Sequence, residues 1–122
     1  MEITAYQKKA ARTLISKPDF AISDEQVMIS WNAIGIAGEA GEVLELIKKG
    51  IYHQQGIDIE KLKKELGDLM WYIAGLSTTL GIQLEDVLKG NLHKLEIRYP
   101  QGYTAEDSRK RVDIKRSTKK KS

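Results

Sequence analysis

Two acidic doublets are the residues of this chain best suited to chemistry. Glu39 and Glu42 stand in the segment GEAGEVLELIKK, and Glu65 and Asp68 stand in KELGDLMWYIAG. On a helix, residues three apart lie on one face, about one turn from each other. Four carboxylates brought together in apolar surroundings repel one another unless a cation lies among them, and Mg²⁺ prefers carboxylate and water ligands. The doublets therefore predict a Mg²⁺ site on a helical scaffold, with Mn²⁺ as a possible substitute.

The apolar neighbours of both doublets favour a metal site over a solvated surface. The first doublet lies in the glycine-rich stretch IGIAGEAGEVLELI, and the second is flanked by Leu66, Leu69 and Trp71. A helix normally buries apolar side chains at such positions. The alternative is a solvated helix face with incidental acidic pairs, which a charged content of 30% makes common.

Three polar residues further along the chain could hold phosphates. Asn91, Lys94 and Arg98 are spaced i, i+3, i+7 and so share one helix face. Lysine and arginine bind phosphate well, arginine through two parallel hydrogen bonds. We add Lys48 to these candidate phosphate or substrate ligands, and the alternative is that all of them are ordinary surface residues.

Two tryptophans are candidates for a nucleobase pocket. Trp71 stands three residues after Asp68 and therefore on the same side of its helix, and Trp31 precedes the first doublet. Aromatic rings stack on bases without regard to sequence. Packing in a protein core is the common alternative for such residues.

The elements that must position these residues are expected to be four helices. Long 3.6-residue periods, two prolines and no alternating valine or isoleucine runs predict an all-α fold, a four-helix bundle-like domain. The helices are expected over residues 3–16, from just after Ser23 to Lys49, 58–81 and 84–98. A unit of this size buries little core, so we expect oligomerisation to complete it.

The bulk properties indicate one domain and a separate basic tail. The chain has 122 residues and no cysteine. Residues 109–122 carry a net charge of +7, while residues 1–108 carry −4. We therefore expect a folded domain over 1–108 and a disordered tail over 109–122. The longest apolar run is too short to cross a bilayer and no secretory signal is visible, so a cytoplasmic location is expected.

The order of three segments resembles a known family. GEAGEVLELIKK, KELGDLMWYIAGLS and NLHKLEIRYPQGY together resemble the MazG-like nucleotide pyrophosphohydrolases, part of the all-α NTP pyrophosphatase superfamily. The resemblance covers about residues 23–108, with an ExxE motif, a spacer and an ExxD motif in the family's order. Gly38 stands where many members carry a further glutamate.

The resemblance implies an enzyme that hydrolyses a nucleoside triphosphate, ribo or deoxy, to the monophosphate and pyrophosphate, in a house-cleaning role for the nucleotide pool. It implies that Glu39, Glu42, Glu65 and Asp68 are catalytic and hold Mg²⁺, with either Glu39 or Glu42 as the acid that handles the water. It also implies that Asn91, Lys94 and Arg98 bind phosphates. Such enzymes are usually homodimers or homotetramers.

Two other readings compete with this one. A di-iron carboxylate bundle needs two Glu-x-x-His motifs, but glycine stands three residues before both His53 and His93. The remaining alternative is a non-enzymatic helical interaction bundle whose basic tail binds nucleic acid or acidic partners. The tail lacks interleaved aromatic residues, so we do not expect it to bind nucleic acid.

Overall fold

The part of the chain that the structure describes is helical. The computed structural model describes residues 1–15 and 17–114, and within these it contains no strand. The helices are α1 (Ile3–Ala11), α2 (Asp24–Ile51), α3 (Ile59–Thr79), α4 (Leu84–Arg98) and α5 (Ala105–Lys110). The predicted all-α class is confirmed. None of the described helices combines the length and the apolar character that crossing a membrane requires.

The two longest helices begin at the capping residues that the sequence predicts. The backbone N–H of Gln26 donates to Oγ of Ser23 at 3.1 Å, and the N–H of Ser23 donates to Oε1 of Gln26 at 3.0 Å. This reciprocal pair is a capping box, which satisfies backbone donors that a helix start leaves free. Asp58 caps α3 by accepting a hydrogen bond from the N–H of Lys61 at 3.1 Å.

The ends of these helices lie close to the predicted ends. α2 runs to Ile51, slightly past the predicted end at Lys49. α3 stops just before Gly81, which has a φ of 69°, and the next N–H, that of Ile82, donates back to the carbonyl of Ser77 at 2.8 Å. That backward bond is the Schellman arrangement that closes helices with glycine. It also turns the chain directly into α4.

The first helix is shorter than predicted. α1 ends at Ala11, whereas the sequence predicts an end at Ser16, a residue outside the described ranges. The hydroxyl of Thr13 donates to the carbonyl of Ala10 at 3.0 Å, and the N–H of Thr13 donates to the same carbonyl at 3.1 Å. Such local bonds compete with the α-helical ladder and tighten its last turn.

A short fifth helix follows the four predicted ones. Thr104 caps α5 by accepting a hydrogen bond from the N–H of Asp107 at 3.0 Å. Six residues are too few for a helix to be stable by itself, since nucleation costs more than so few bonds return. α5 therefore depends on contacts with the rest of the chain.

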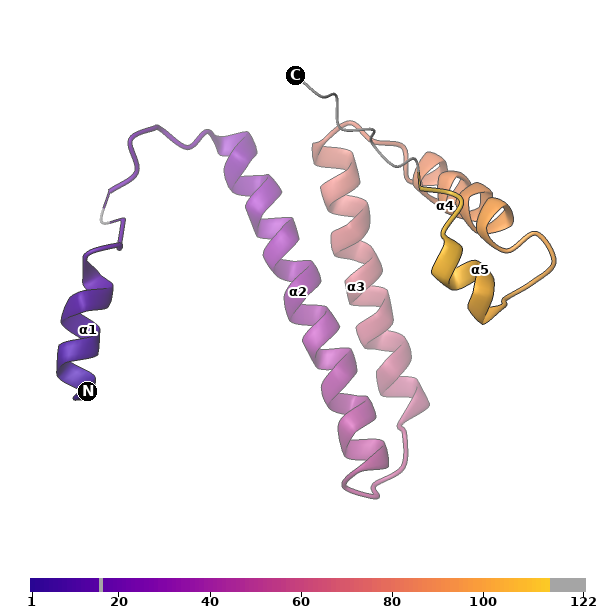
Figure 1. Cartoon of the computed structure of the whole chain (residues 1–122), viewed down its shortest axis with the longest axis horizontal. Coiled ribbons are helices and arrows are strands. Elements are labelled where there is room, and N and C mark those ends of the chain that lie inside the picture. The colour runs from indigo at the N-terminus through magenta and orange to yellow at the C-terminus, as the bar shows by residue number, and fades with distance from the viewer. Residues whose placement is uncertain (16, 115–122) are drawn as a thin grey trace.

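α2 and α3 form an antiparallel hairpin that dominates the structure (Figure 1). In the same view α1 stands apart from the hairpin, and α4 and α5 lie together on its other side. A Cβ atom on Gly35 of α2 would overlap the ring of Tyr72 of α3, so glycine is needed there for the helices to approach closely. A single chain thus does not close four helices around one core, and completion by oligomerisation remains a prediction.

Burial within one chain is unusually sparse. Among the described residues no hydrophobic side chain is buried, and the two buried residues, Asn32 and Ser77, are both polar. Large apolar side chains such as Ile34, Leu44 and Leu92 are exposed. Soluble proteins rarely leave so much apolar surface in water unless something covers it.

An ion pair holds the segment after α5 against α4. Nε of Arg98 donates to Oδ1 of Asp113 at 2.6 Å, and a terminal nitrogen donates to Oδ2 at 2.8 Å. The side chains are only 13% and 2% exposed, respectively. The Arg98 guanidinium lowers the pKa of Asp113, and Asp113 in turn raises the pKa of Arg98. Two parallel charge-assisted bonds of this kind are among the stronger polar contacts in proteins.

The Arg98–Asp113 pair bears on the predicted tail. The predicted boundary at residue 109 falls inside α5, and Asp113 lies beyond it. The remainder of the predicted tail, 115–122, lies outside the described residues. The division into a domain over 1–108 and a tail over 109–122 remains a prediction, while residues 109–113 take part in folded contacts.

We expect Asp113→Asn to loosen α5. At neutral pH, hydrogen exchange of the amides in residues 105–114 should be faster in the variant than in the wild type, because Arg98 loses its anionic partner. The pair stabilises the fold above the ordinary aspartate pKa of about 4. That contribution is lost as the pH falls through the lowered folded-state pKa of Asp113, so the difference between the proteins should shrink in acid.

Glu85→Gln serves as the matched control on α4. Its pair with Lys89 is 3.0 Å long but largely exposed, and exposed pairs contribute little. Equal exchange in wild type and Asp113→Asn across residues 105–114 at neutral pH would contradict the anchoring role.

Candidate metal centre

The hairpin brings three of the four predicted acids together. One carboxylate oxygen each from Glu39, Glu65 and Asp68 lie within 4.8 Å of one another. Glu39 comes from the middle of α2, and the other two come from the first half of α3. Because the helices are antiparallel and closely packed, the i, i+3 face of α3 meets the facing residue of α2.

The three acids form an electrostatically strained cluster. Oε2 of Glu39 is buried, and no described residue donates a hydrogen bond to it. Hydrogen bonding to the neighbouring Glu65 carboxyl raises the pKa of Glu39 most, and burial and the charges of Glu65, Asp68 and Glu42 raise it further.

This chemistry fits a hard divalent cation. The cluster supplies only oxygen ligands, each from a carboxylate, and Mg²⁺ binds such groups while retaining water ligands. A cation would remove the repulsion among the acids and give the orphaned oxygen of Glu39 a partner. The donor set contains no histidine or cysteine, which softer metals prefer.

Glu42 stands outside the three-acid group. It lies one turn after Glu39 on α2 and is exposed. Its charge still reaches Glu39, where it contributes to the raised pKa. Its predicted roles as fourth ligand or as the acid that handles water remain predictions.

The structure does not bring the predicted phosphate ligands to the acids. Asn91 and Lys94 are exposed on α4, and no hydrogen bond or ion pair among the described residues joins either to the cluster. Arg98 is held by Asp113. Nζ of Lys48 lies 3.6 Å from Oε2 of Glu45, a residue one turn earlier on α2, and both side chains are exposed. All four assignments therefore remain predictions, and Arg98 has a structural role that the sequence analysis did not anticipate.

The two tryptophans differ in their surroundings. Trp31 and Trp71 are 62% and 67% exposed, so neither is a core residue in the single chain. Trp71 packs edge-on against Tyr72, with ring centroids 5.1 Å apart, and lines a groove between α2 and α3 together with Asn32. The roles of Trp31 and Trp71 in a base pocket both remain predictions.

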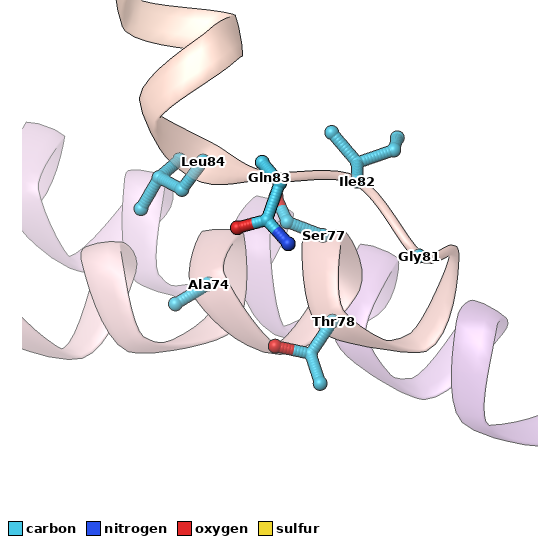
Figure 2. A pocket seen from close by; sticks show the side chains of 7 residues that line it. All are labelled: Ala74, Ser77, Thr78, Gly81, Ile82, Gln83 and Leu84. Carbon is cyan, nitrogen blue, oxygen red and sulfur yellow. The ribbon is translucent and has the colours of Figure 1, made fainter.

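A more enclosed cavity lies elsewhere, at the junction of α3 and α4. It has a volume of about 330 Å³ and is lined by residues from Ala74 to Leu84, including Ser77 (Figure 2). It contains none of the acidic residues of the cluster.

Two residues with structural or site roles were not predicted from the sequence. Asn32 lies seven residues before Glu39 and hence on nearly the same helix face, a spacing that could have drawn attention to it. Asp113 gave no comparable signal, because its partner Arg98 lies fifteen residues away along an irregular path.

Comparison with known proteins shows which family the chain resembles. Residues 30–103 match the family model described as the MazG nucleotide pyrophosphohydrolase domain. The Gene 37 protein of Mycobacterium phage L5 is 35% identical over 106 residues, which cover 84% of this chain and 92% of that protein. No solved structure gives a significant match.

Replacing Glu39 by glutamine is expected to separate stability from metal binding. The variant removes one of three clustered negative charges, so the metal-free protein should melt at a higher temperature than the wild type at neutral pH. The rise in melting temperature on adding Mg²⁺ should shrink, with affinity reduced about tenfold or more. Thermal denaturation with and without MgCl₂ measures both effects.

The matched control is Glu60→Gln on α3, which removes an exposed carboxylate paired only with Lys63. Both of its melting temperatures should follow the wild type. A metal-free Glu39→Gln protein that is less stable than the wild type, or an unchanged response to Mg²⁺, would contradict a metal centre at this cluster.

Proposed function

The chain belongs to the MazG nucleotide pyrophosphohydrolase family, and from this premise we propose that it hydrolyses nucleoside triphosphates to the monophosphate and pyrophosphate in the presence of Mg²⁺. The observation that carries the proposal is the cluster of Glu39, Glu65 and Asp68, with its buried and unpartnered carboxylate oxygen. A role in clearing unwanted nucleotides from the pool accords with this activity.

The residues that would hold Mg²⁺ are Glu39, Glu65 and Asp68, with Glu42 at the exposed edge. When bound, Mg²⁺, or Mn²⁺ in its place, neutralises charge on phosphate oxygens and makes a water molecule a better nucleophile. In the hydrolysis a water oxygen attacks the α-phosphorus, the bond from the α-phosphorus to the bridging oxygen breaks, and pyrophosphate leaves. Glu42 is exposed and lies beside the cluster, so it or Glu39 can accept the proton that the water gives up.

The cationic residues of α4 would contribute to phosphate binding. Lys94 is exposed, and its ammonium group can reach solvent-borne phosphates, while Asn91 on the same face can donate hydrogen bonds through its amide. Arg98 keeps one edge of its guanidinium on Asp113, which leaves the N–H groups of the other edge as possible donors. Lys48 would act from the end of α2.

A homodimer or homotetramer is part of the proposal. The described residues contain no buried apolar core, and large apolar side chains on several helices face solvent. Covering these faces with a second copy would supply the burial that one chain lacks.

The full-length protein is expected to release pyrophosphate from at least one nucleoside triphosphate when Mg²⁺ or Mn²⁺ is present, and to stop when EDTA is added. Glu65→Gln should lower kcat by about 100-fold or more, because it removes charge from the centre that stabilises the transition state. A coupled pyrophosphate assay with nucleoside monophosphate detection measures both.

Glu60→Gln again provides the control, since its exposed carboxylate belongs to the same helix but not to the cluster. Its turnover should match the wild type. A panel of ribo- and deoxyribonucleotides that yields no pyrophosphate with either metal would exclude the proposed function and favour an interaction bundle instead.

A further inference from the structure

A groove lies between α2 and α3, the two helices that also carry the acidic cluster. It has a volume of about 400 Å³, and its lining residues are Met28, Asn32, Trp71, Ala74, Gly75, Thr78 and Thr79. Trp71 follows the cluster residue Asp68 by three positions. Asn32 precedes Glu39 by seven positions on α2, and Gly75 follows Asp68 by seven on α3, so the groove lies about two helical turns, roughly 10 Å, from the acids.

Asn32 is the most buried residue of the described chain, although it is polar. It is 5% exposed, and its Nδ2 donates to the backbone carbonyl of Met28 at 2.9 Å. This bond assigns the positions of Nδ2 and Oδ1 in the carboxamide, because only the nitrogen can donate to a carbonyl. The carboxamide oxygen, Oδ1, therefore faces away from its own helix.

The oxygen of Asn32 lies against α3. A Cβ on Gly75 would come within 2.6 Å of Oδ1, so glycine leaves the room that this oxygen occupies. No described residue donates a hydrogen bond to Oδ1. Because Asn32 lines the groove, a ligand there can reach Oδ1, and a ligand that brings a hydrogen-bond donor would be favoured over one that does not.

The other polar groups of the groove strengthen its acceptor character. The hydroxyl of Thr79 donates to the carbonyl of Gly75 at 2.8 Å, which leaves only its lone pairs for a ligand. The hydroxyl of Thr78 can either donate or accept. Trp71 adds an exposed aromatic surface on which a flat ring can stack.

We propose that this groove holds the base of the substrate nucleotide, and that Oδ1 of Asn32 accepts a hydrogen bond from an exocyclic amino group of that base. The inference rests on the proposed function, which puts the phosphates at the acidic cluster. A nucleotide spans from base to phosphates in one extended unit, which matches a groove two turns from the acids. Bases with an exocyclic amino group, namely cytosine, adenine and guanine, are then preferred over uracil and thymine, which have none.

Matched pairs of substrates test this preference directly. The base of dCTP differs from that of dUTP in having an amino group in place of a carbonyl oxygen, and dATP differs from dITP in the same way. With the full-length protein and Mg²⁺, kcat/KM should favour the amino member of at least one pair by about 10-fold or more, since in the other member a carbonyl oxygen, which cannot donate, would face Oδ1 of Asn32. Preference for the carbonyl member in both pairs, or no preference in either, would overturn the inference.

Asn32→Leu keeps nearly the same side-chain size but removes the acceptor. We expect it to lower kcat/KM for the amino substrate by about 10-fold or more and to leave the carbonyl substrate nearly unchanged, so that the discrimination disappears. Ser77→Ala is the control, because Ser77 is also buried and polar, but its hydroxyl already donates to the carbonyl of Ile73 at 2.9 Å, and Ser77 lines the cavity of Figure 2 and not the groove. Ser77→Ala should preserve the discrimination.

The outcomes distinguish failure of the proposed function from failure of base recognition by Asn32. Wild-type protein that releases no pyrophosphate from any nucleotide refutes the proposed function. Active wild-type protein in which Asn32→Leu slows both members of a pair equally shows that Asn32 only supports the helix packing, and refutes the inference alone. The wild-type comparison between substrates stays decisive even if the variant fails to fold.

Discussion

The close approach of α2 to α3 is the constraint on which the rest of this chain depends. Gly35 against Tyr72 and Gly75 against Asn32 allow the two helices to pack nearer than ordinary side chains permit. That separation determines whether carboxylates on facing helices meet at one cation or remain separate surface charges. It also sets the width of the groove beside Trp71, so one packing distance governs both ends of the proposed substrate site.

The acidic cluster carries a stability cost that the cation would relieve. A buried oxygen of Glu39 without a donor, surrounded by like charges, opposes the packing that the glycines permit. Sites of this kind are usually retained because they do chemistry, since uncharged side chains would pack there more favourably. Asn32 is comparable to the acidic cluster in this respect, because an apolar side chain would pack better at its buried position between two helices.

Much of the fold follows from local signals, while the site depends on relations between helices. Ser23 and Asp58 mark helix starts because capping acts over a few residues, and the structure agrees with both. The end of α1 was wrong because Thr13 redirects its own hydrogen bonds. The spacing within each acidic doublet predicts that its two acids share a helix face. Which acids meet across the hairpin depends instead on the offset and rotation of α2 against α3. Glu42 is therefore outside the group of three, and the Arg98–Asp113 contact could not be anticipated.

The scarcity of buried apolar side chains also bears on how the chain folds. A hairpin that buries no hydrophobic residue gains little free energy when it forms in isolation, because burial is the main term that offsets conformational entropy. Where a second copy supplies the missing contacts, folding and association become one reaction, whose equilibrium depends on protein concentration. Dilution would then unfold the chain rather than release a folded subunit, and the amount of active protein would rise more steeply than the amount synthesised.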